Sequence, residues 1–470
     1  MSKCARHEEY VSPFSARYCS SEMSHLFSAS FKITTFRKLW IALAKAQQSL
    51  GLPISRKQIS QMESKIKAID FEKTEEYEKK FRHDVMAHIH AFGDACPDAK
   101  PIIHLGATSS FVTDNGDLIQ MREGLSLLLQ KLLLVLQRFS KLAEKHAAAP
   151  CLSYTHFQPA QPTTIGKRIC LWLQDFLLDA KEWQRCLEEL PFLGVKGATG
   201  TQASFLALFE GSHSKVTALE KKIAKTFGFE KILPIAGQTY TRKIDLQLLN
   251  AFESFAVSAH KFATDVRLLA HEGEILEAFG ESQVGSSAMP YKRNPIYCER
   301  ICGIARFAIS LAQNPAYTAA TQWLERSLDD SSNRRLCIPE AFLSIDAILN
   351  LVLHVLDGIK IETKTALSRL DEQLPFLVME NILMEAVKRG ANRQEVHEKL
   401  RKIAHSPDPM NALFRSKEFP LSFQEMKALA HPKGLIGRSP EQVNEFLTQE
   451  LRPFLKRQRV RKISLSRVEF

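Results

Sequence analysis

Long stretches of helix-periodic apolar residues constrain the fold of this chain more than any other feature. They cover residues 26–50, 117–149, 163–190, 244–279, 295–312 and 339–356. Within 117–149 the apolar positions form more than one stripe, which predicts a helix buried from several sides. Strand signals are short, at 102–103 and 232–233 at most. The sequence therefore predicts an all-α protein built around a long central helical bundle.

Domain boundaries are expected near residues 110 and 362 of the 470-residue chain. They predict an N-terminal helical domain (1–110), a central long-helix bundle domain (111–362) and a C-terminal helical domain (363–470). The central helices carry more apolar surface than one slim bundle can cover, so several chains are expected to associate. A large monomeric bundle is the alternative.

The formal net charge of +11 favours anionic partners, either nucleic acid or a small substrate with phosphate and carboxylate groups. Basic residues are not gathered into repeats or aromatic-interleaved patches, apart from the tail 456–462, which is interpreted as a solvated end. A small substrate is therefore the favoured partner, and nucleic acid is not expected.

Cysteine usage and hydropathy indicate the compartment. The nine cysteines are scattered and contain no C-x-x-C pair, which argues for a reducing environment and against a disulfide framework or zinc site. The N-terminus lacks an apolar run of signal-peptide type. The uncharged stretch 307–324 contains Pro315 and several amides, typical of a buried helix pair with a break rather than a membrane span. A cytoplasmic protein without a membrane partner is expected.

The segment 285–295 combines residues that rarely occur together. It begins Gly-Ser-Ser, continues through Met-Pro-Tyr-Lys-Arg and ends Asn-Pro, between two long helical stretches. Glycine, proline and small side chains let a backbone approach a ligand, while hydroxyl, amide and cationic groups suit an anion. The segment is predicted to be a lid over an anionic substrate; a solvated loop is the alternative.

This segment resembles the signature loop of the fumarase/aspartase superfamily, and its form S-A-M-P-Y-K-R-N-P is similar to the adenylosuccinate lyase branch. Five further segments carry the same resemblance, in this order: R-H-D-V-M-A-H (82–88), H-L-G-A-T-S (104–109), T-H-F-Q-P-A-Q (155–161), Q-T-Y-T-R-K (238–243) and L-D-D-S-S-N-R-R (328–335). The resemblance extends from about residue 10 to about residue 397.

The resemblance implies a fold, an activity and an assembly. The fold is the three-domain, all-α fumarase/aspartase architecture. The activity is elimination of fumarate from adenylosuccinate, giving AMP, and from the succinylaminoimidazole-carboxamide ribotide of purine biosynthesis. Proton removal beside a carboxylate, followed by C–N cleavage, needs a base, an acid and anion-stabilising groups. It requires no metal and no other cofactor. The assembly is a homotetramer in which three chains contribute to each site.

The resemblance also implies catalytic roles. Ser286 is the base at carbon, with loop amides and Lys292 stabilising its anion; Ser287 is the neighbour with which it could be confused. His156 is the general acid at the leaving nitrogen, a role suited to imidazole, whose pKa generally lies near neutral pH. Glu299 orients His156. His83 contacts the substrate; because His83, His88 and His90 do not share one helix face, a metal cluster is not expected.

Further positions are implied to bind substrate, and each has a structural alternative. The succinyl carboxylates are assigned to Thr108, Ser109, Lys292 and Asn294. The remaining substrate-binding residues are Arg17, Tyr18, Arg82, Asp84, Thr155, Gln238, Arg300, Arg326, Ser331 and Arg335. Arginine suits bidentate oxyanion contacts. Taken alone, His83 and His156 are structural histidines, Asp84 is a helix cap, and 326–335 is a charged surface stretch.

Two other functions are alternatives to the activity that the resemblance implies. A sibling lyase, of argininosuccinate lyase or fumarase type, is disfavoured by Tyr291-Lys292-Arg293 and by the phosphate-suited arginines. A catalytically silent structural or RNA-binding protein of the same fold is the alternative from another class, because a fold alone does not establish an activity.

Overall fold

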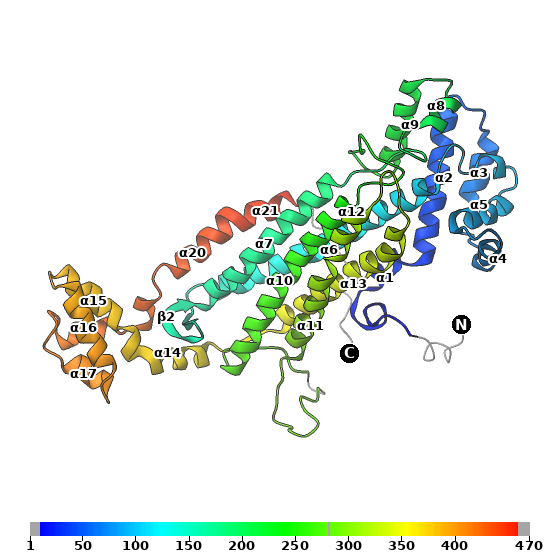
Figure 1. Cartoon of the computed structure of the whole chain (residues 1–470). Coiled ribbons are helices and arrows are strands. Elements are labelled where there is room, and N and C mark those ends of the chain that lie inside the picture. Colours follow the sequence, from blue (N-terminus) through cyan, green and yellow to red (C-terminus); the bar gives the residue numbers. More distant parts are fainter. Residues whose placement is uncertain (1–9, 281–282, 459–470) are drawn as a thin grey trace.

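The computed structural model describes residues 10–280 and 283–458 of the chain. They form an elongated, mainly helical molecule in which a long bundle separates two smaller groups of helices (Figure 1). The N-terminal elements η2 (Phe14–Tyr18) and α1 (Ser21–Leu26) pack on the bundle. The first group comprises α2 (Ala29–Ser49), α3 (Arg56–Ser64), α4 (Phe71–Phe81), α5 (Asp84–Ala95) and η3 (Lys100–Ile102).

The bundle region follows. Its elements are α6 (Ser109–Lys145), β1 (Pro150–Thr155), β2 (Gln158–Thr164), α7 (Ile165–Glu189), α8 (Ala203–Leu208), α9 (His213–Thr226), α10 (Lys243–His271), β3 (Ile275–Leu276), α11 (Ile296–Leu311), α12 (Asn314–Thr321), α13 (Asp329–Gly358) and β4 (Lys360–Ile361). Short α8 and α9 lie beside α2 at one end (Figure 1).

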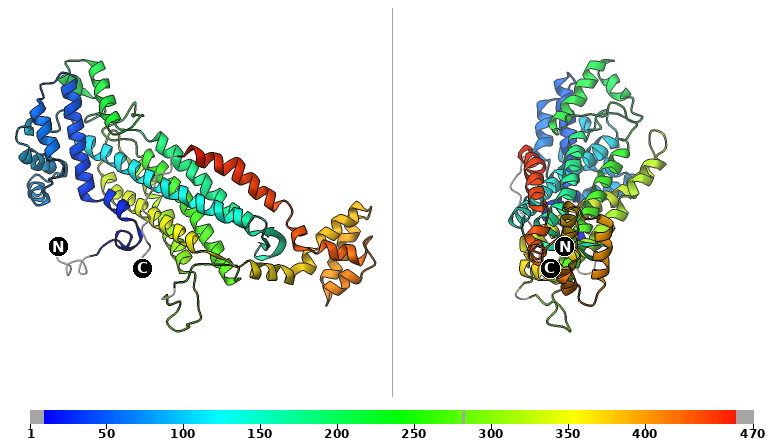
Figure 2. Two further views of the ribbon diagram at one scale, coloured as in Figure 1. Left: turned by 180° about the vertical axis from the view of Figure 1, so that it is seen from behind. Right: turned by 90° about the vertical axis from the view of Figure 1, so that its left-hand side faces the viewer.

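The C-terminal elements are α14 (Thr363–Leu377), α15 (Met379–Lys388), α16 (Arg393–Ala404), α17 (Pro409–Arg415), α18 (Phe423–Leu429), α19 (Pro432–Leu435), α20 (Ser439–Glu445), η4 (Phe446–Leu451) and α21 (Arg452–Arg457). Helices α15 to α18 form the far end of the molecule around a small core of their own. Helix α14 connects them to the bundle and packs against β1, whereas α20 and α21 return along α7 (Figures 1 and 2). The basic tail beyond residue 458 lies outside the described residues.

Helix α6 forms the centre of the bundle. Leu118, Leu125 and Leu132 are fully buried, together with residues on its other faces, which confirms that this helix is buried from several sides. At Gly124 an added Cβ would lie 2.7 Å from the Phe342 ring, so only glycine permits this close crossing with α13. The all-α expectation is therefore confirmed in the packing of the bundle.

A buried polar cluster ties the N-terminal segment to the bundle. Lys131 Nζ on α6 donates to Asp346 Oδ1 (2.5 Å) and Asn350 Oδ1 (2.8 Å) on α13. The Ser20 amide donates to Asp346 Oδ2 at 2.6 Å, and Asn350 Nδ2 donates to the Tyr18 carbonyl at 3.3 Å. Each charge is thus paired inside the protein, as buried charges must be, and η2 is held against α13.

The predicted strands were wrong. Residue 102 belongs to a 3₁₀ helix, and Ile232 forms only an isolated bridge with Phe192. The strands instead form a hairpin, in which β1 pairs antiparallel with β2, and a short β3–β4 pair. The hairpin was not predicted because β2 contains Pro159 and Pro162, and prolines normally argue against a strand. They are tolerated here because β2 pairs with one neighbour only.

Several helices extend beyond the predicted limits. Helix α6 begins at Ser109 and α13 at Asp329, both upstream of the predicted starts, and α13 continues through Pro339. The stretch 307–324 spans the end of α11 and all of α12, with the predicted break between them. The pair is not buried throughout, because the side chain of Tyr317 on α12 is 70% exposed. Helix α13 is long and apolar enough to cross a membrane, yet 83% of its most apolar window is buried inside the protein.

A buried carboxylate on α7 makes stability depend on pH. Asp179 is 3% exposed and accepts a hydrogen bond from Ser254 Oγ at 2.8 Å. Burial raises the pKa of Asp179 from 3.8 to about 6, although the Ser258 and Ser254 hydroxyls act in the opposite direction. The folded protein therefore binds this proton more tightly than the unfolded chain, so its contribution is favourable below about pH 4 and is lost as pH rises through about 6.

Asp179→Asn is expected to stabilise the protein at pH 8 by about 3 kcal/mol, because asparagine is neutral at every pH. The gain should shrink towards zero as pH approaches 4. Urea denaturation across this range measures it, with Asp371→Asn, an exposed carboxylate on α14, as the control. A gain that does not change with pH would contradict the assignment.

Candidate active site

A cavity of about 890 Å³ lies where the N-terminal helices meet the bundle. It is lined by the α4–α5 junction, the start of α6, and the segment leading into α13. Seven of the predicted site residues line it: Arg82, His83, Asp84, Ser109, Arg326, Ser331 and Arg335. Three motifs far apart in the sequence are therefore brought together by the fold of one chain.

The R-H-D motif forms the junction between α4 and α5. Arg82 ends α4 with a left-handed backbone (φ 54°), a conformation that is strained for a residue other than glycine. His83 is the N-cap of α5, because its Nδ1 accepts from the Met86 amide at 3.3 Å. Asp84, which by itself would be interpreted as a helix cap, is instead the first residue of α5. Its carboxylate accepts a hydrogen bond from Arg335 Nη2 at 3.2 Å. The motif is thus a structural junction and also faces the cavity.

The H-L-G-A-T-S motif precedes α6. His104 Nδ1 accepts from Trp40 Nε1 at 2.9 Å, and burial lowers the pKa of His104 to about 4, so this histidine is a neutral structural residue. Thr108 occupies the N-cap position of α6, but its hydroxyl makes no capping bond. The hydroxyls of Thr108 and Ser109 therefore lie at the positive end of a 37-residue helix, where anions are favoured.

Buried ion pairs hold the cavity wall. Arg242, which is 3% exposed, donates to Asp114 Oδ2 (2.9 Å) and Asp330 Oδ2 (2.7 Å). Arg334 pairs with Asp245 at 2.7 Å and Asp117 at 2.9 Å. Burial alone would lower the pKa of Arg242, but Asp114 raises it, so the guanidinium stays charged. None of these residues was predicted as part of the site, although Arg242, Asp330 and Arg334 lie in motifs that the sequence singled out.

The network includes Arg326, a predicted substrate-binding residue. Arg326 Nη1 donates to both oxygens of Asp330, at 3.0 and 3.1 Å. Asp330 is 1% exposed and is held in place by its hydrogen bond with Arg242. It therefore positions the Arg326 side chain at the cavity. The Gln238 amide donates to the Glu325 carbonyl at 3.1 Å, which places the Q-T-Y-T-R-K segment against the residue before Arg326.

Asp330→Asn is expected to lower stability by about 3 kcal/mol, because it leaves a buried arginine short of a charged partner. It should also raise KM more than it lowers kcat, since Arg326 loses its anchor. Denaturation and steady-state kinetics measure the two effects. The control is Asp357→Asn, which removes the half-exposed partner of Arg138 and should change stability by less than about 1 kcal/mol. Equal stability losses in both variants would contradict the prediction.

The lid segment projects from the bundle between β3 and α11 (Figures 1 and 2). Ser286 Oγ accepts hydrogen bonds from the amides of Ala288 (3.3 Å) and Met289 (3.1 Å). Two N–H groups aimed at one hydroxyl oxygen lower the cost of placing negative charge on it. Loop amides, which the sequence interpretation invoked to stabilise a Ser286 anion, therefore contact its oxygen. The role of Ser286 as a base stays a prediction.

The shape of the lid depends on Gly285 and Asn294. Asn294 Nδ2 donates to the Gly285 carbonyl at 2.9 Å and closes the loop. A Cβ at Gly285 would lie 1.8 Å from the Lys292 carbonyl oxygen, so glycine is required there. Lys292 is exposed and makes no salt bridge among the described residues, and its side chain is available to a ligand.

The base of the lid is anchored by a residue that sequence reasoning missed. Glu277 accepts from the amides of Tyr297 (3.1 Å) and Cys298 (2.6 Å) in the first turn of α11. Burial raises the pKa of Glu277, and the Cys298 contacts oppose this. The anchor fixes the turn that carries Glu299 and Arg300. Nothing in the sequence singled out this glutamate, because it lies just outside the recognised loop.

His156 lies at the tip of the β1–β2 hairpin. Thr155 pairs with Gln158, so His156 and Phe157 are the two central residues of the turn, and both have positive φ (54° and 57°). Such two-residue hairpin turns normally use Asn or Gly at these positions. The backbone therefore carries strain to present an exposed imidazole, which is typical of a functional position.

One protomer does not assemble all the predicted residues. The hairpin bearing Thr155 and His156 lies near α14, at the end of the bundle opposite α4 and α5 (Figure 1). Among the described residues no hydrogen bond joins His156 to Glu299 or to the lid. Arg17 and Tyr18 lie in η2, which is packed on α13. Within the described part of one chain, the cavity brings together seven of the predicted residues.

Comparison with known proteins identifies the family. The family described as "Lyase" matches residues 21–309. The chain is 47% identical over 463 residues to "Adenylosuccinate lyase" of Schizosaccharomyces pombe, covering 95% of this chain and 96% of the relative. It is 45% identical to "Adenylosuccinate lyase" of Saccharomyces cerevisiae, covering 96% and 97%.

Solved structures show the same fold. The 3-carboxy-cis,cis-muconate lactonizing enzyme from Pseudomonas putida has a TM-score of 0.83 at 23% identity, covering 93% of this chain and 99% of that one. The fumarate lyase from Mesorhizobium sp. BNC1 has a TM-score of 0.81 at 21% identity, with the same coverage. The chain belongs to the adenylosuccinate lyase family, within the fumarase/aspartase superfamily.

Proposed function

We propose that this protein removes fumarate from adenylosuccinate, giving AMP, and from the succinylaminoimidazole-carboxamide ribotide of purine biosynthesis. The identity of 45–47% to adenylosuccinate lyases over nearly the full chain carries this conclusion. The paired amides on Ser286 and the arginine-lined cavity provide chemistry suited to it.

In the proposed reaction Ser286, as its anion, takes a proton from the carbon next to a carboxylate of the succinyl group. The electron pair forms the fumarate double bond, the C–N bond breaks, and His156 gives a proton to the leaving nitrogen. The amides of Ala288 and Met289 stabilise the serine anion, and Lys292 approaches when the lid closes. Thr108, Ser109 and Asn294 hold the carboxylates, whose negative charge increases as the proton leaves.

The phosphate and ribose are assigned to the arginine side of the cavity. Arg326 and Arg335 are presented there by Asp330 and Asp84, with Ser331 between them. Arg82 and His83 also line the cavity. Arg17, Tyr18, Gln238, Arg300 and Thr155 complete the proposed substrate contacts, and Asp84 acts through Arg335. Glu299 orients His156 from a neighbouring chain.

The proposed assembly is a homotetramer whose sites are shared between chains. Two observations support it. In one protomer the β1–β2 hairpin lies at the end of the bundle opposite α4 and α5, whose junction lines the cavity (Figure 1). Large apolar side chains are also exposed along the long helices, including Leu171 (53%) and Leu178 (58%) on α7 and Val257 (52%) on α10. A cytoplasmic location is proposed with it, and neither nucleic acid nor a membrane is a proposed partner.

An ultraviolet absorbance assay with both nucleotide substrates, purified protein and no added metal tests the function. Release of fumarate from both is the expected result. Argininosuccinate and malate serve as comparison substrates: turnover of either one, with neither nucleotide cleaved, would assign the protein to a sibling activity. Light scattering on the same sample tests the assembly, and an active monomer would contradict shared sites.

A further inference from the structure

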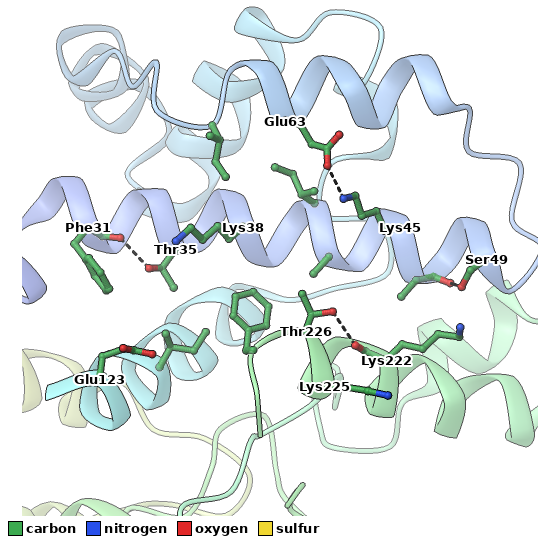
Figure 3. A pocket seen from close by; sticks show the side chains of 16 residues that line it. Phe31, Thr35, Lys38, Lys45, Ser49, Glu63, Glu123, Lys222, Lys225 and Thr226 are labelled. Carbon is green, nitrogen blue, oxygen red and sulfur yellow. Dashed lines mark hydrogen bonds and ion pairs between the residues drawn. The ribbon is translucent and has the colours of Figure 1, made fainter. Parts of the chain in front are cut away.

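A second cavity, of about 990 Å³, lies between α2, α3, α6 and α9 (Figure 3). It shares no lining residue with the 890 Å³ cavity, and none of its lining residues has a role in the proposed reaction. Its volume is within the range of small-molecule sites in proteins.

The floor of this cavity is apolar and its rim is basic. Ile41, Ala42 and Ile119 are each less than 10% exposed and form part of the floor. Lys38 and Lys45 come from α2, and Lys222 and Lys225 come from α9 on the other side. A large apolar surface rimmed by lysines is suited to an anion that also has an apolar body.

Most of the positive charge is available to a ligand. Lys45 is paired with Glu63 at 2.5 Å. Within the described residues, Lys38, Lys222 and Lys225 each make no salt bridge, and Glu123 is the remaining carboxylate on the lining. Three lysines against one carboxylate leave a net charge of about +2 at the rim, which favours a polyanion over a singly charged one.

The polar groups are distributed unevenly along the cavity. In Figure 3, Lys222 and Lys225 extend in the same direction at one end, on the side of Ser49. Phe31 and Glu123 lie at the other end. Lysine ammonium groups bind phosphates as point charges, an aromatic ring can stack on a base, and a carboxylate accepts from an exocyclic amine.

We propose that this cavity binds a nucleoside polyphosphate whose base carries an amino group. The phosphates contact Lys222 and Lys225, the base lies against Phe31, and its amine donates to Glu123. Lys38 approaches the ligand from α2. This site is separate from the lyase site and extends beyond the proposed function.

Calorimetric titration of the full-length assembled protein with ATP tests the proposal, and the lysine variants below distinguish this cavity from the lyase site, whose residues they leave unchanged. ATP is expected to bind, and Lys222→Glu with Lys225→Glu should weaken binding about tenfold or more through charge reversal. The lyase kcat/KM should not change. Lys222→Arg with Lys225→Arg keeps the charge and should retain binding. The matched control, Lys221→Glu, lies on the same helix outside the cavity lining and should have little effect.

Two other ligands separate the parts of the site. Adenosine lacks the phosphates and inorganic tripolyphosphate lacks the base, so each should bind more weakly than ATP. Tripolyphosphate binding as tightly as ATP would overturn the nucleotide assignment. ATP binding that is unchanged by the double lysine-to-glutamate change would place the ligand elsewhere. Because the readout is binding, these results do not depend on lyase activity.

Discussion

Replacing Ser286 by alanine is expected to lower kcat by about 10³-fold or more, since it removes the proposed base at carbon. The hydroxyl oxygen accepts two backbone amides, so the loop stabilises a negative charge that alanine cannot carry. Within the described residues the Ser286 hydroxyl is hydrogen-bonded only in its own loop, so the variant should remain folded and assembled. Single-turnover measurement of fumarate release distinguishes slow chemistry from slow product release.

Ser287 provides the matched control for this variant. It is exposed and next to Ser286, yet the two loop amides point at Ser286 rather than at Ser287. Ser287→Ala should therefore change kcat by less than about tenfold. A large loss in Ser287→Ala together with a near-normal rate in Ser286→Ala would reverse the assignment, an alternative that the sequence alone left open.

His156→Asn is expected to lower kcat by about 10²- to 10⁴-fold, the usual contribution of a general acid. Asparagine tolerates the left-handed backbone of this turn, so the variant removes the imidazole while preserving the hairpin. Measurement of kcat against pH checks the role: the limb of the profile caused by the acid should disappear. A near-normal rate, or an unchanged profile in a slower enzyme, would remove His156 from the role.

The control for His156 is its neighbour Phe157, which shares the positive φ. Phe157→Asn removes the ring contact with Tyr154, whose centroid is 5.5 Å away, but leaves the imidazole in place. It should affect stability more than the chemical step. A loss of kcat as large as that of His156→Asn would mean that the turn itself, rather than the imidazole, matters for the rate.

The helices could be predicted from apolar spacing, because local periodicity reports which faces are buried. The predicted first and last residues of the helices were less accurate. Helix α13 continues through Pro339 because surrounding packing overrides a local helix breaker. The β1–β2 hairpin was not predicted, because Pro159 and Pro162 argue against a strand. Its turn also has His-Phe at the two positions where a glycine-containing pair is usual.

Residues of the candidate site could be predicted only where they lie in a short motif whose residue types by themselves suggest a chemical role. Resemblance indicated the lid and the R-H-D junction. The junction lines the 890 Å³ cavity, and the ligand-binding roles of both segments stay predictions. The supporting ion pairs were not predictable, because Arg242 is separated from Asp114 by 128 residues and from Asp330 by 88. Their pairing depends on the tertiary fold, and local sequence patterns do not report which charges become buried together.

In the proposed tetramer, distant segments of different chains meet at one C–N bond. Mixing the inactive Ser286→Ala and His156→Asn proteins, with dissociation and reassembly, tests it most directly. If the two side chains come from different protomers, random hybrids should recover about a quarter of the wild-type activity, because one chain supplies an intact serine and its neighbour an intact histidine. Hybrids that form, as shown by mass spectrometry, but stay inactive would contradict shared sites.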